Sequence, residues 1–481
     1  MTQMEDLLWQ SARETAQLIR DGNVSAVEVM NAHYNQIEAL NPMLNAIVNL
    51  LPRERALALA AHADKAISAG TRVGPLHGIP MAPKDMIDVQ GFPTTQGFVP
   101  FADRVAASDC ELVARQRQAG ALMIGKTNLP EFALGSHTFN ELFGITRNPY
   151  DHSRTAGGSS GGAAAALASG MLSIADGSDM GGSLRNPAAF CNVVGLRPSI
   201  GRVPDERGFG WLGRLATAGP MARSVRDMAW LFSVQAGPFP GDPLTLPEPG
   251  SVFRDIPEID LSGKRVAMTE DLNLVPVDSE VRHAVQAAAR TLETLGAQVE
   301  VACPDLSEAM AVFQTLRAAN LAVTGRTLDR SVPDWRSHAK DTAIWNIEKG
   351  FALTADEIID AELNHTRIFR EVSSFFDNFD LLVLPSAQVP PFPVEMHWVD
   401  EIEGQTLDTY IDWMTVCCAI SVIGLPALSI PGGFTAGGLP IGVQFVAGPR
   451  QDLALLAMAQ CFEQATGFGA RRPGATTATA T

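Results

Sequence analysis

The chain has 481 residues, 46% of them hydrophobic and 19% charged, which is typical of a globular protein with a large buried core. It carries 36 basic and 53 acidic residues, and the formal net charge of −17 disfavours nucleic acid and anionic membranes as partners. The N-terminal segment lacks the pattern of a signal peptide, and no apolar run is long enough to span a bilayer. The 6 Cys form no CxxC pair, so we expect reduced thiols and a cytoplasmic protein.

The N-terminal part of the chain is predicted to be mainly helical. Residues 5–40 predict two helices, because apolar side chains recur at helical spacing around a break near Ser25. Residues 53–69 are Ala-rich and predict a further helix. Residues 110–119 predict another helix, and residues 121–124 form a short apolar run typical of a buried strand.

Residues 156–183 contain two Gly/Ser clusters on either side of an Ala-rich stretch. Low complexity of this kind is common in linkers. The Ala run and the apolar residues Met171, Leu172 and Ile174 instead predict a tightly packed core segment. Glycine at this density allows close backbone approach and lets N–H groups point at a ligand.

The C-terminal half alternates strands and helices. Residues 264–302 predict a strand, a helix and a second strand, and Gly296 ends the helix. Residues 305–372 are mostly helical, and residues 380–385 predict a buried strand. This alternation predicts an α/β fold.

The sequence matches three known motif patterns, but the residues around each match do not predict the secondary structure that the motif requires. Residues 120–127 match a phosphate loop, but the residues between the glycines are themselves an apolar strand. Residues 208–213 match a dinucleotide motif without a strand before it. Residues 157–161 match the GxSxG nucleophile elbow, yet turn-forming residues precede them, so an esterase of that type stays only as an alternative.

Histidine offers little support for a metal site or a general base. The 9 His show no metal-ligand spacing, so no metal is expected. His152 lies near the first Gly/Ser cluster and His77 near Lys84, and either could act as a base. A lone His is more often a surface or packing residue.

A lysine and several serines form the favoured constellation. Lys84 has apolar neighbours that predict burial, which would lower its pKa towards neutrality, although an ion pair with Asp85 or Asp88 is the alternative. Ser159 and Ser160 lie in the first Gly cluster and Ser183 in the second. Such serines are often only turn or cap residues, but with a buried amine they could form a nucleophile-and-base system.

At these residues the chain resembles amidase signature family hydrolases. The resemblance covers nearly the whole chain, is weakest at about 235–420, and depends on linked strings rather than one motif. The strings are GIPMAPKD (78–85), GALMIGKTNLPEFA (120–133), TRNPYDHSRTAGGSSGGAAAALASG (146–170), DGSDMGGSLRNPAAFCNVVGLRPSIGRV (176–203), GPMARSVRDMA (219–229) and GLPALSIPGGFTAGGLPIGVQFVAGP (424–449). Departures from the family pattern occur at Ala156, Ser178 and Ser421, outside the expected catalytic residues.

The resemblance implies a Ser–cis-Ser–Lys triad. Ser183 matches the nucleophile, Ser159 the bridging serine with a cis peptide, and Lys84 the base. It also implies structural support from Ser160 and from an ion pair between Asp179 and Arg185. The implied oxyanion hole is formed by backbone N–H groups of four residues, Met180, Gly181, Gly182 and Ser183.

The resemblance also implies the fold: one large three-layer α/β/α domain with a central mixed sheet surrounded by helices. This domain would occupy residues 1–470 and be followed by a flexible tail at 471–481. Its expected parts are N-terminal helices (1–70), a catalytic core (71–235 and 420–465) and a variable substrate-shaping region (236–419). Trp335, Trp345, Trp398 and Trp413 of the last region could line a pocket or belong to the core.

The implied activity is hydrolysis of a carbon–nitrogen amide bond in a small molecule, giving a carboxylic acid and ammonia or an amine. No cofactor is expected, neither nucleic acid nor a membrane is expected as a partner, and a homodimer is allowed. Carbamate, urea-type and ester hydrolysis are alternatives. The glutaminase subunit of a tRNA-dependent amidotransferase is disfavoured, because residues 214–220 lack the Asp of that group. Outside the family, an elbow-type esterase using Ser159 and His152, or a binding subunit without activity, remain alternatives.

Overall fold

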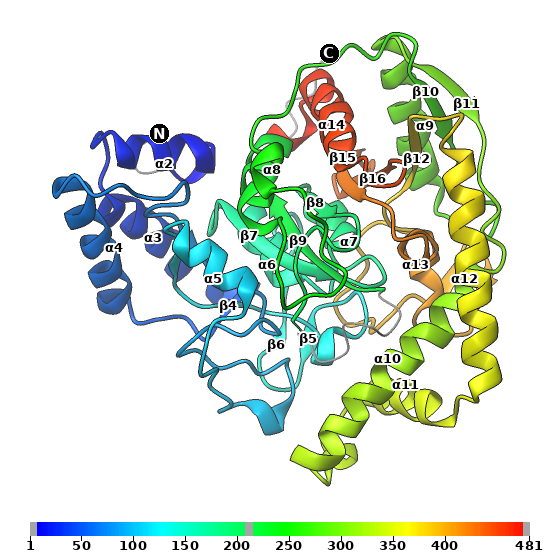
Figure 1. Ribbon diagram of the computed structural model, residues 1–481, viewed down its shortest axis with the longest axis horizontal. Helices are drawn as coiled ribbons and strands as arrows, with labels where there is room; N and C mark the ends of the chain where they lie inside the picture. The colour runs from blue at the N-terminus through cyan, green and yellow to red at the C-terminus, as the bar shows by residue number, and fades with distance from the viewer. Residues whose placement is uncertain (1–6, 207–214, 475–481) are drawn as a thin grey trace.

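A mixed eight-stranded sheet forms the centre of the fold (Figure 1). The computed structural model describes residues 7–206 and 215–474. The strand order is β11-β10-β12-β16-β15-β8-β9-β7, with β10 parallel to both β11 and β12 and the other pairs antiparallel. The strands are β7 (Ile174–Asp179), β8 (Val194–Arg197), β9 (Thr217–Ala222), β10 (Arg265–Met268), β11 (Gln298–Val301), β12 (Leu381–Pro385), β15 (Ala427–Phe434) and β16 (Pro440–Val446).

In the described part of the chain, four two-stranded sheets lie outside the central sheet. They pair β1 (Ile47–Val48) with β4 (Lys126–Thr127), β2 (Pro80–Met81) with β3 (Leu122–Met123), β5 (Phe139–Asn140) with β6 (Gly144–Ile145), and β13 (Glu401–Ile402) with β14 (Gln405–Thr406).

Helices surround the central sheet, with α2–α4 on one side of the molecule and α10–α12 on the opposite side (Figure 1). The helices are α2 (Ala12–Arg20), α3 (Ala26–Leu44), α4 (Arg53–Ser68), α5 (Glu111–Gln118), α6 (Gly161–Ala168), α7 (Arg185–Phe190), α8 (Val225–Gln235), α9 (Ser279–Thr294), α10 (Ala309–Ser331), α11 (Asp341–Ala352), α12 (Ala355–Phe375), α13 (Thr415–Val422) and α14 (Asp452–Thr466). Short 3₁₀ helices occur at Val99–Phe101, Glu131–Ala133, Gly250–Phe253, Trp335–Ser337, Asp412–Met414 and Phe468–Ala470.

Alternate residues of β12 show why the fold has three layers. Leu381 and Val383 belong to the core cluster that includes α8 and α14. Leu382 and Leu384 belong to the cluster that includes α10, α12 and α13. Successive side chains of a strand point to opposite faces, so helices cover both faces of this sheet. The predicted α/β/α architecture with a mixed sheet is therefore confirmed.

The local predictions also agree with the structure. The strand–helix–strand unit is β10, α9 and β11, and its two strands are parallel. Gly296 follows α9 with a φ of +99°, which favours glycine. The Ala-rich segment forms α6, and every residue of α6 is buried, as expected for core rather than linker.

Two sequence predictions fall partly or wholly outside the described residues. The loop at 208–213 lies in the segment 207–214, and most of the tail at 471–481 lies in 475–481. Where the tail is described, the Arg471 carbonyl accepts a hydrogen bond of 2.6 Å from the Tyr150 hydroxyl.

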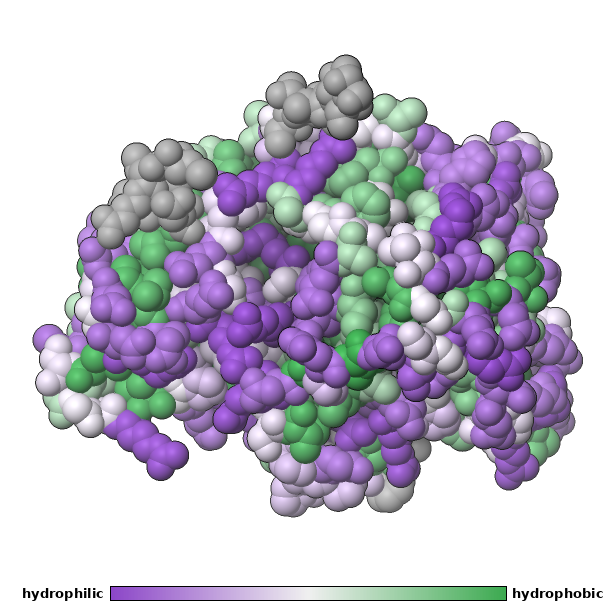
Figure 2. Space-filling model, turned by 90° about the horizontal axis from the view of Figure 1, so that it is seen from above, coloured by the Kyte–Doolittle hydropathy of each residue, from purple (hydrophilic) through white to green (hydrophobic). Residues whose placement is uncertain are grey.

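Over residues 7–206 and 215–474, no helix is long and apolar enough to cross a membrane. Hydrophilic and hydrophobic residues are interspersed on the face shown in Figure 2.

Candidate active site

Lys84 follows β2, and its side chain is fully buried, as its apolar neighbours predict. Its Nζ lies 2.7 Å from Ser159 Oγ, 3.0 Å from Ser160 Oγ and 3.0 Å from Ser178 Oγ. Its backbone N–H donates to Asp176 of β7 over 2.9 Å, which fixes the chain next to the central sheet. The amine therefore lies among three hydroxyl groups.

Asp85 forms its ion pair with a second buried lysine. Lys126 Nζ lies 3.6 Å from Asp85 Oδ1 and donates to the Ile87 carbonyl over 2.5 Å. Burial raises the pKa of Asp85 although the charge of Lys126 opposes this shift. Lys126, the lysine of the phosphate-loop-like sequence at 120–127, is thus part of a buried network. A 3₁₀ helix rather than an α-helix follows this sequence.

The first Gly/Ser cluster is connected directly to the second. The Gly158–Ser159 peptide bond is cis, as the family resemblance implies. The Ser160 N–H donates to the Ser183 carbonyl over 3.2 Å, and its hydroxyl accepts from the Ser178 N–H over 3.4 Å. A Cβ at Gly177 would lie 2.6 Å from Ser160 Oγ, so glycine is needed for this approach.

The turn after β7 carries Ser183. Gly182 has a φ of +109°, and a Cβ there would lie 2.6 Å from Cys417 Cβ. A Cβ at Gly181 would lie 2.9 Å from Cys418 Sγ. The two glycines therefore let the turn pack closely against α13.

The backbone N–H groups of this turn are not equivalent. The Gly182 N–H donates to Asp179 Oδ1 over 2.9 Å, and the Leu184 N–H donates to Asp179 Oδ2 over 3.1 Å. The N–H groups of Met180, Gly181 and Ser183 donate to no other residue that the structure describes. Of the four expected oxyanion donors, Gly182 is thus already engaged by Asp179.

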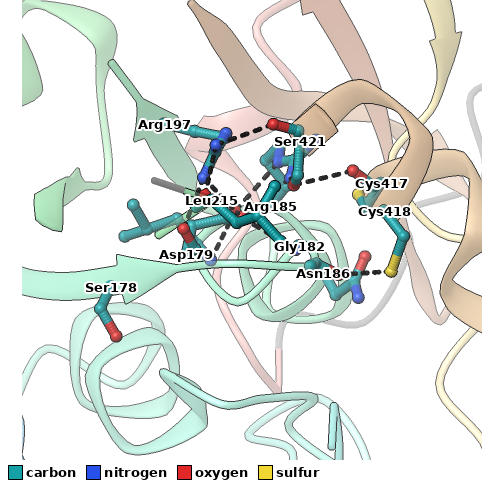
Figure 3. Close-up of polar contacts among 12 residues, drawn as sticks. Ser178, Asp179, Gly182, Arg185, Asn186, Arg197, Leu215, Cys417, Cys418 and Ser421 are labelled. Carbon is teal, nitrogen blue, oxygen red and sulfur yellow. Dashed lines mark hydrogen bonds and ion pairs between the residues drawn. The ribbon is translucent and has the colours of Figure 1, made fainter. Parts of the chain in front are cut away.

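Asp179 is braced by two arginines (Figure 3). Arg185 contacts both of its carboxylate oxygens, at 2.8 and 3.0 Å, and Arg197 donates to its carbonyl over 2.5 Å. All three side chains are fully buried. Burial alone would raise the pKa of Asp179, but Arg185 and then Arg197 hold it well below its usual range. The expected Asp179–Arg185 pair is present, whereas the role of Arg197 was not predicted.

Figure 3 also shows Ser178 and Asp179 pointing to opposite sides of β7. Asp179 points to the arginines, and Ser178 lies within hydrogen-bond distance of Lys84. This is the alternation expected of a strand. Ser178 was noted in the sequence only as a departure from the family pattern, and strand periodicity next to Asp179 was the available signal for its position.

A cavity brings Ser159 and Ser183 together. The 313–418 part of the chain contributes the other wall, within the region predicted to shape the substrate site. The apolar lining residues are Met86, Phe132, Ala133, Leu134, Met180, Ala216, Phe313, Leu321, Ile411 and Met414. None of the four candidate Trp lines this cavity; Trp335 and Trp413 are buried core residues and Trp345 is exposed.

The expected triad is assembled in part. Lys84 and Ser159 are hydrogen-bonded, and Ser183 shares the cavity with Ser159. Among the described hydrogen bonds, none joins the Ser159 and Ser183 hydroxyls. A proton relay needs that bond when substrate is bound, and catalytic hydrogen bonds are often looser in unliganded proteins.

The two histidines considered as bases lie elsewhere. His152 is exposed, whereas Ser159 is buried. His77 is buried and its Nε2 lies 3.0 Å from the Ala63 carbonyl. No strand leads directly into residues 157–161, so the context of a nucleophile elbow is lacking there.

A family model described as Amidase matches residues 28–456. The fold, the linked strings and this match show that the chain belongs to the amidase signature family of hydrolases.

Relatives from several organisms cover almost the full chain. An acylamidase of Rhodococcus erythropolis is 35% identical, with 98% of each chain covered. A glutamyl-tRNA(Gln) amidotransferase subunit from Synechococcus sp. (strain CC9605) is 36% identical, over 95% of this chain and 97% of that protein. The crystal structure of a bacterial aryl acylamidase of the same family has a TM-score of 0.89 at 30% identity and covers 97% of this chain and 99% of its own.

Proposed function

We propose that this protein is an amidase that cleaves linear carbon–nitrogen amide bonds through an acyl-enzyme on Ser183. The observation that carries the proposal is the fully buried Lys84 amine, 2.7 Å from Ser159 Oγ, next to the cavity that Ser159 shares with Ser183. The similarity to an acylamidase and to an aryl acylamidase supports an amide as the substrate.

In the proposed acylation step, the neutral Lys84 amine accepts a proton from Ser159, which accepts one from Ser183. The Ser183 oxygen then forms a bond to the amide carbonyl carbon. As the tetrahedral intermediate collapses, the carbon–nitrogen bond breaks. Ser159 gives its proton to the leaving nitrogen, and Lys84 returns a proton to Ser159.

Water completes the proposed cycle. It gives a proton to the same relay and attacks the acyl-enzyme, and the Ser183 oxygen leaves and takes the proton back. The products are a carboxylic acid and ammonia or an amine.

Backbone donors of the turn would stabilise the negative oxygen that forms in both steps. We assign this role to the N–H groups of Met180, Gly181 and Ser183, because Asp179 already accepts from Gly182. Removing one such donor in other enzymes costs roughly 3–4 kcal/mol of transition-state stabilisation. Asp179, Arg185 and Ser160 would act by holding the turn and the two Gly/Ser clusters in place.

Related activities remain alternatives within the same mechanism. Esters and carbamates present a similar carbonyl to Ser183. A glutaminase role is kept as a second candidate because a glutamyl-tRNA(Gln) amidotransferase component is among the relatives, although residues 214–220 lack the Asp expected of that group. We further propose a cytoplasmic location, which the 6 free Cys support.

A substrate panel tests this proposal. Purified protein is given simple aliphatic and aryl amides, esters, carbamates and glutamine, and released acid and amine are quantified. We expect amide cleavage by the protein alone. Glutamine hydrolysis that depends on the other components of an amidotransferase would favour the second candidate. Failure to cleave any of these substrates, both alone and with those components, would contradict both candidates.

A further inference from the structure

Arg317 lines the cavity that contains Ser159 and Ser183. It lies on α10, four residues after Phe313, and residues at this spacing share one face of a helix. Its side chain is buried, with the residue only 6% exposed. Arg317 is absent from the proposed proton relay, so its position in the cavity requires a separate explanation.

Neutral groups hold the guanidinium in place. One terminal nitrogen donates to Asn346 Oδ1 of α11, and the other donates to the Tyr410 hydroxyl over 2.5 Å. Asn346 also donates to the Tyr410 hydroxyl, over 2.6 Å. The three side chains brace one another, so the planar fork of Arg317 has a fixed orientation.

These partners do not neutralise the charge of Arg317. Among the described residues, no Asp or Glu forms an ion pair with it. Of the undescribed residues, only Glu5 and Asp6 at the N-terminal end carry a carboxylate side chain, and the segments 207–214 and 475–481 carry none. Burial lowers the pKa of nearby Lys340 to about 8, Glu131 opposes the shift, and the charge of Arg317 lowers that pKa further. The charge of Arg317 therefore acts on a neighbouring buried amine.

Most of the other side chains that line this cavity in the 313–418 region are apolar. They are Phe313, Leu321, Ile411 and Met414. A buried charge is costly unless a partner of opposite charge accompanies it. Arginine also matches a carboxylate with two parallel hydrogen bonds. An anionic group of the substrate would supply the missing partner.

We propose that Arg317 binds a carboxylate of the substrate, and that the preferred substrates are amides with an apolar spacer between this carboxylate and the scissile bond. The apolar lining contacts the spacer. The position of Arg317 selects the distance between the carboxylate and the scissile bond, and its positive charge selects a negatively charged substrate. This inference rests on the proposed amidase function, and it adds a substrate class to it.

Paired substrates test the inference. The p-nitroanilides of succinate, glutarate and adipate are each compared with a neutral isostere in which an isopropyl group replaces the carboxylate; for glutarate this is 5-methylhexanoyl-p-nitroanilide. We expect the wild-type protein to favour at least one anionic member in kcat/KM. Arg317→Met should lower kcat/KM for that member by about ten- to a hundredfold and leave its isostere nearly unchanged.

Two variants control for charge and for folding. Arg317→Lys keeps the positive charge but lacks the planar guanidinium. Its kcat/KM for the anionic substrate should lie between those of Arg317→Met and wild type. Arg326→Met removes an exposed arginine of the same helix. It should leave kcat/KM unchanged for both the anionic substrate and its neutral isostere. Circular dichroism and melting temperature check that each variant folds.

Binding without turnover gives a second readout. Glutarate, succinate or adipate should raise the melting temperature of Ser183→Ala protein more than the matched neutral-tailed acid does. This difference should vanish when Arg317→Met is added and should become smaller when Arg317→Lys is added. The inference would be overturned if anionic and neutral members were equal in wild-type kcat/KM and also equal in their effect on the melting temperature of Ser183→Ala protein. This result would count even if Arg317→Met did not fold.

The two proposals fail in different ways. Suppose that Ser183→Ala abolishes cleavage, while the Arg317 variants have the same kcat/KM as wild type for both anionic and neutral substrates. In that case only the proposed carboxylate site is wrong. If Ser183→Ala retains cleavage, the proposed function itself is wrong.

Discussion

Lys84 is the side chain on which the proposed chemistry most depends. It is fully buried, and its amine lies among the hydroxyls of Ser159, Ser160 and Ser178. Only a neutral amine can accept a proton, so activity should fall on the acidic side as this amine becomes protonated.

We predict that Lys84→Met lowers kcat/KM by about a hundredfold or more, because a general base contributes on this scale. Any remaining activity should lose the acidic limb of the pH–rate profile. The measurement is kcat/KM across pH, with circular dichroism to confirm folding. Lys65→Met, at an exposed position of α4, should behave like wild type. A folded Lys84→Met protein with near-normal turnover would remove Lys84 from the mechanism.

Individual residues differ in how well the sequence predicts them. The buried lysine and the Asp179–Arg185 pair are present where the family strings place them. Arg197 was missed because its contact with Asp179 depends on the register of β7, β9 and β8 in the sheet. Arg317 was missed because α10 reaches the cavity only through tertiary packing, which local patterns do not encode.

At the level of elements, α6 shows how glycine brings separate segments together at the site. The helix begins at Gly161, directly after Ser159 and Ser160. A Cβ at Gly162 would lie 2.4 Å from the Asn128 backbone nitrogen and 2.6 Å from the Ala46 carbonyl oxygen. Backbone atoms cannot move aside as a flexible side chain can, so this approach requires glycine.

Gly162→Ala should therefore destabilise the protein by about 1–3 kcal/mol or more, as overpacking does in other cores. It should also lower activity, because the start of α6 positions the serines. Chemical denaturation measures the first effect. Gly437→Ala is the matched control, since its Cβ would meet only Thr435 Oγ1 at 3.7 Å, and it should change stability by less than about 0.5 kcal/mol. Equal stability of the two variants would contradict the close-approach explanation.

Elements with strong local signals were predicted well. The strand–helix–strand unit of β10, α9 and β11 was found from apolar periodicity and a helix-ending glycine. The two-residue strands β5 and β6 were not, because such short pairs are defined by a partner strand rather than by their own sequence. The strand order of the central sheet was not predicted: the family resemblance implied only that the sheet is mixed, and pairing between distant strands leaves no local pattern.

On the scale of the whole molecule, Glu463 connects two helices that cover one face of the sheet. It lies on α14 and accepts a hydrogen bond of 2.8 Å from the Val225 N–H at the start of α8. Burial raises the pKa of Glu463 to about 7, although the Val225 hydrogen bond opposes the shift. In an unfolded chain a Glu titrates near 4.3.

The sign of the resulting pH dependence follows from this difference. The folded state holds the proton more tightly, so this stabilising contribution is complete below about pH 4.3 and is lost as pH rises through about 7. Glu463→Gln stays neutral and keeps an oxygen for the Val225 N–H.

We predict that the melting temperature of Glu463→Gln increases relative to that of wild type as pH rises from 5 to 8. Thermal melts at matched ionic strength measure the difference. The exposed Glu293→Gln should give a curve parallel to wild type. A Glu463→Gln curve that is also parallel would show that Glu463 is ionised in the folded protein throughout this range.

The acyl-enzyme can be detected from the mass of the protein during turnover of a slowly deacylating substrate, followed by peptide mapping. We predict a gain equal to one acyl group, located on Ser183 and absent from Ser183→Ala. An acyl group on Ser159 or elsewhere, or unchanged turnover by Ser183→Ala, would contradict it.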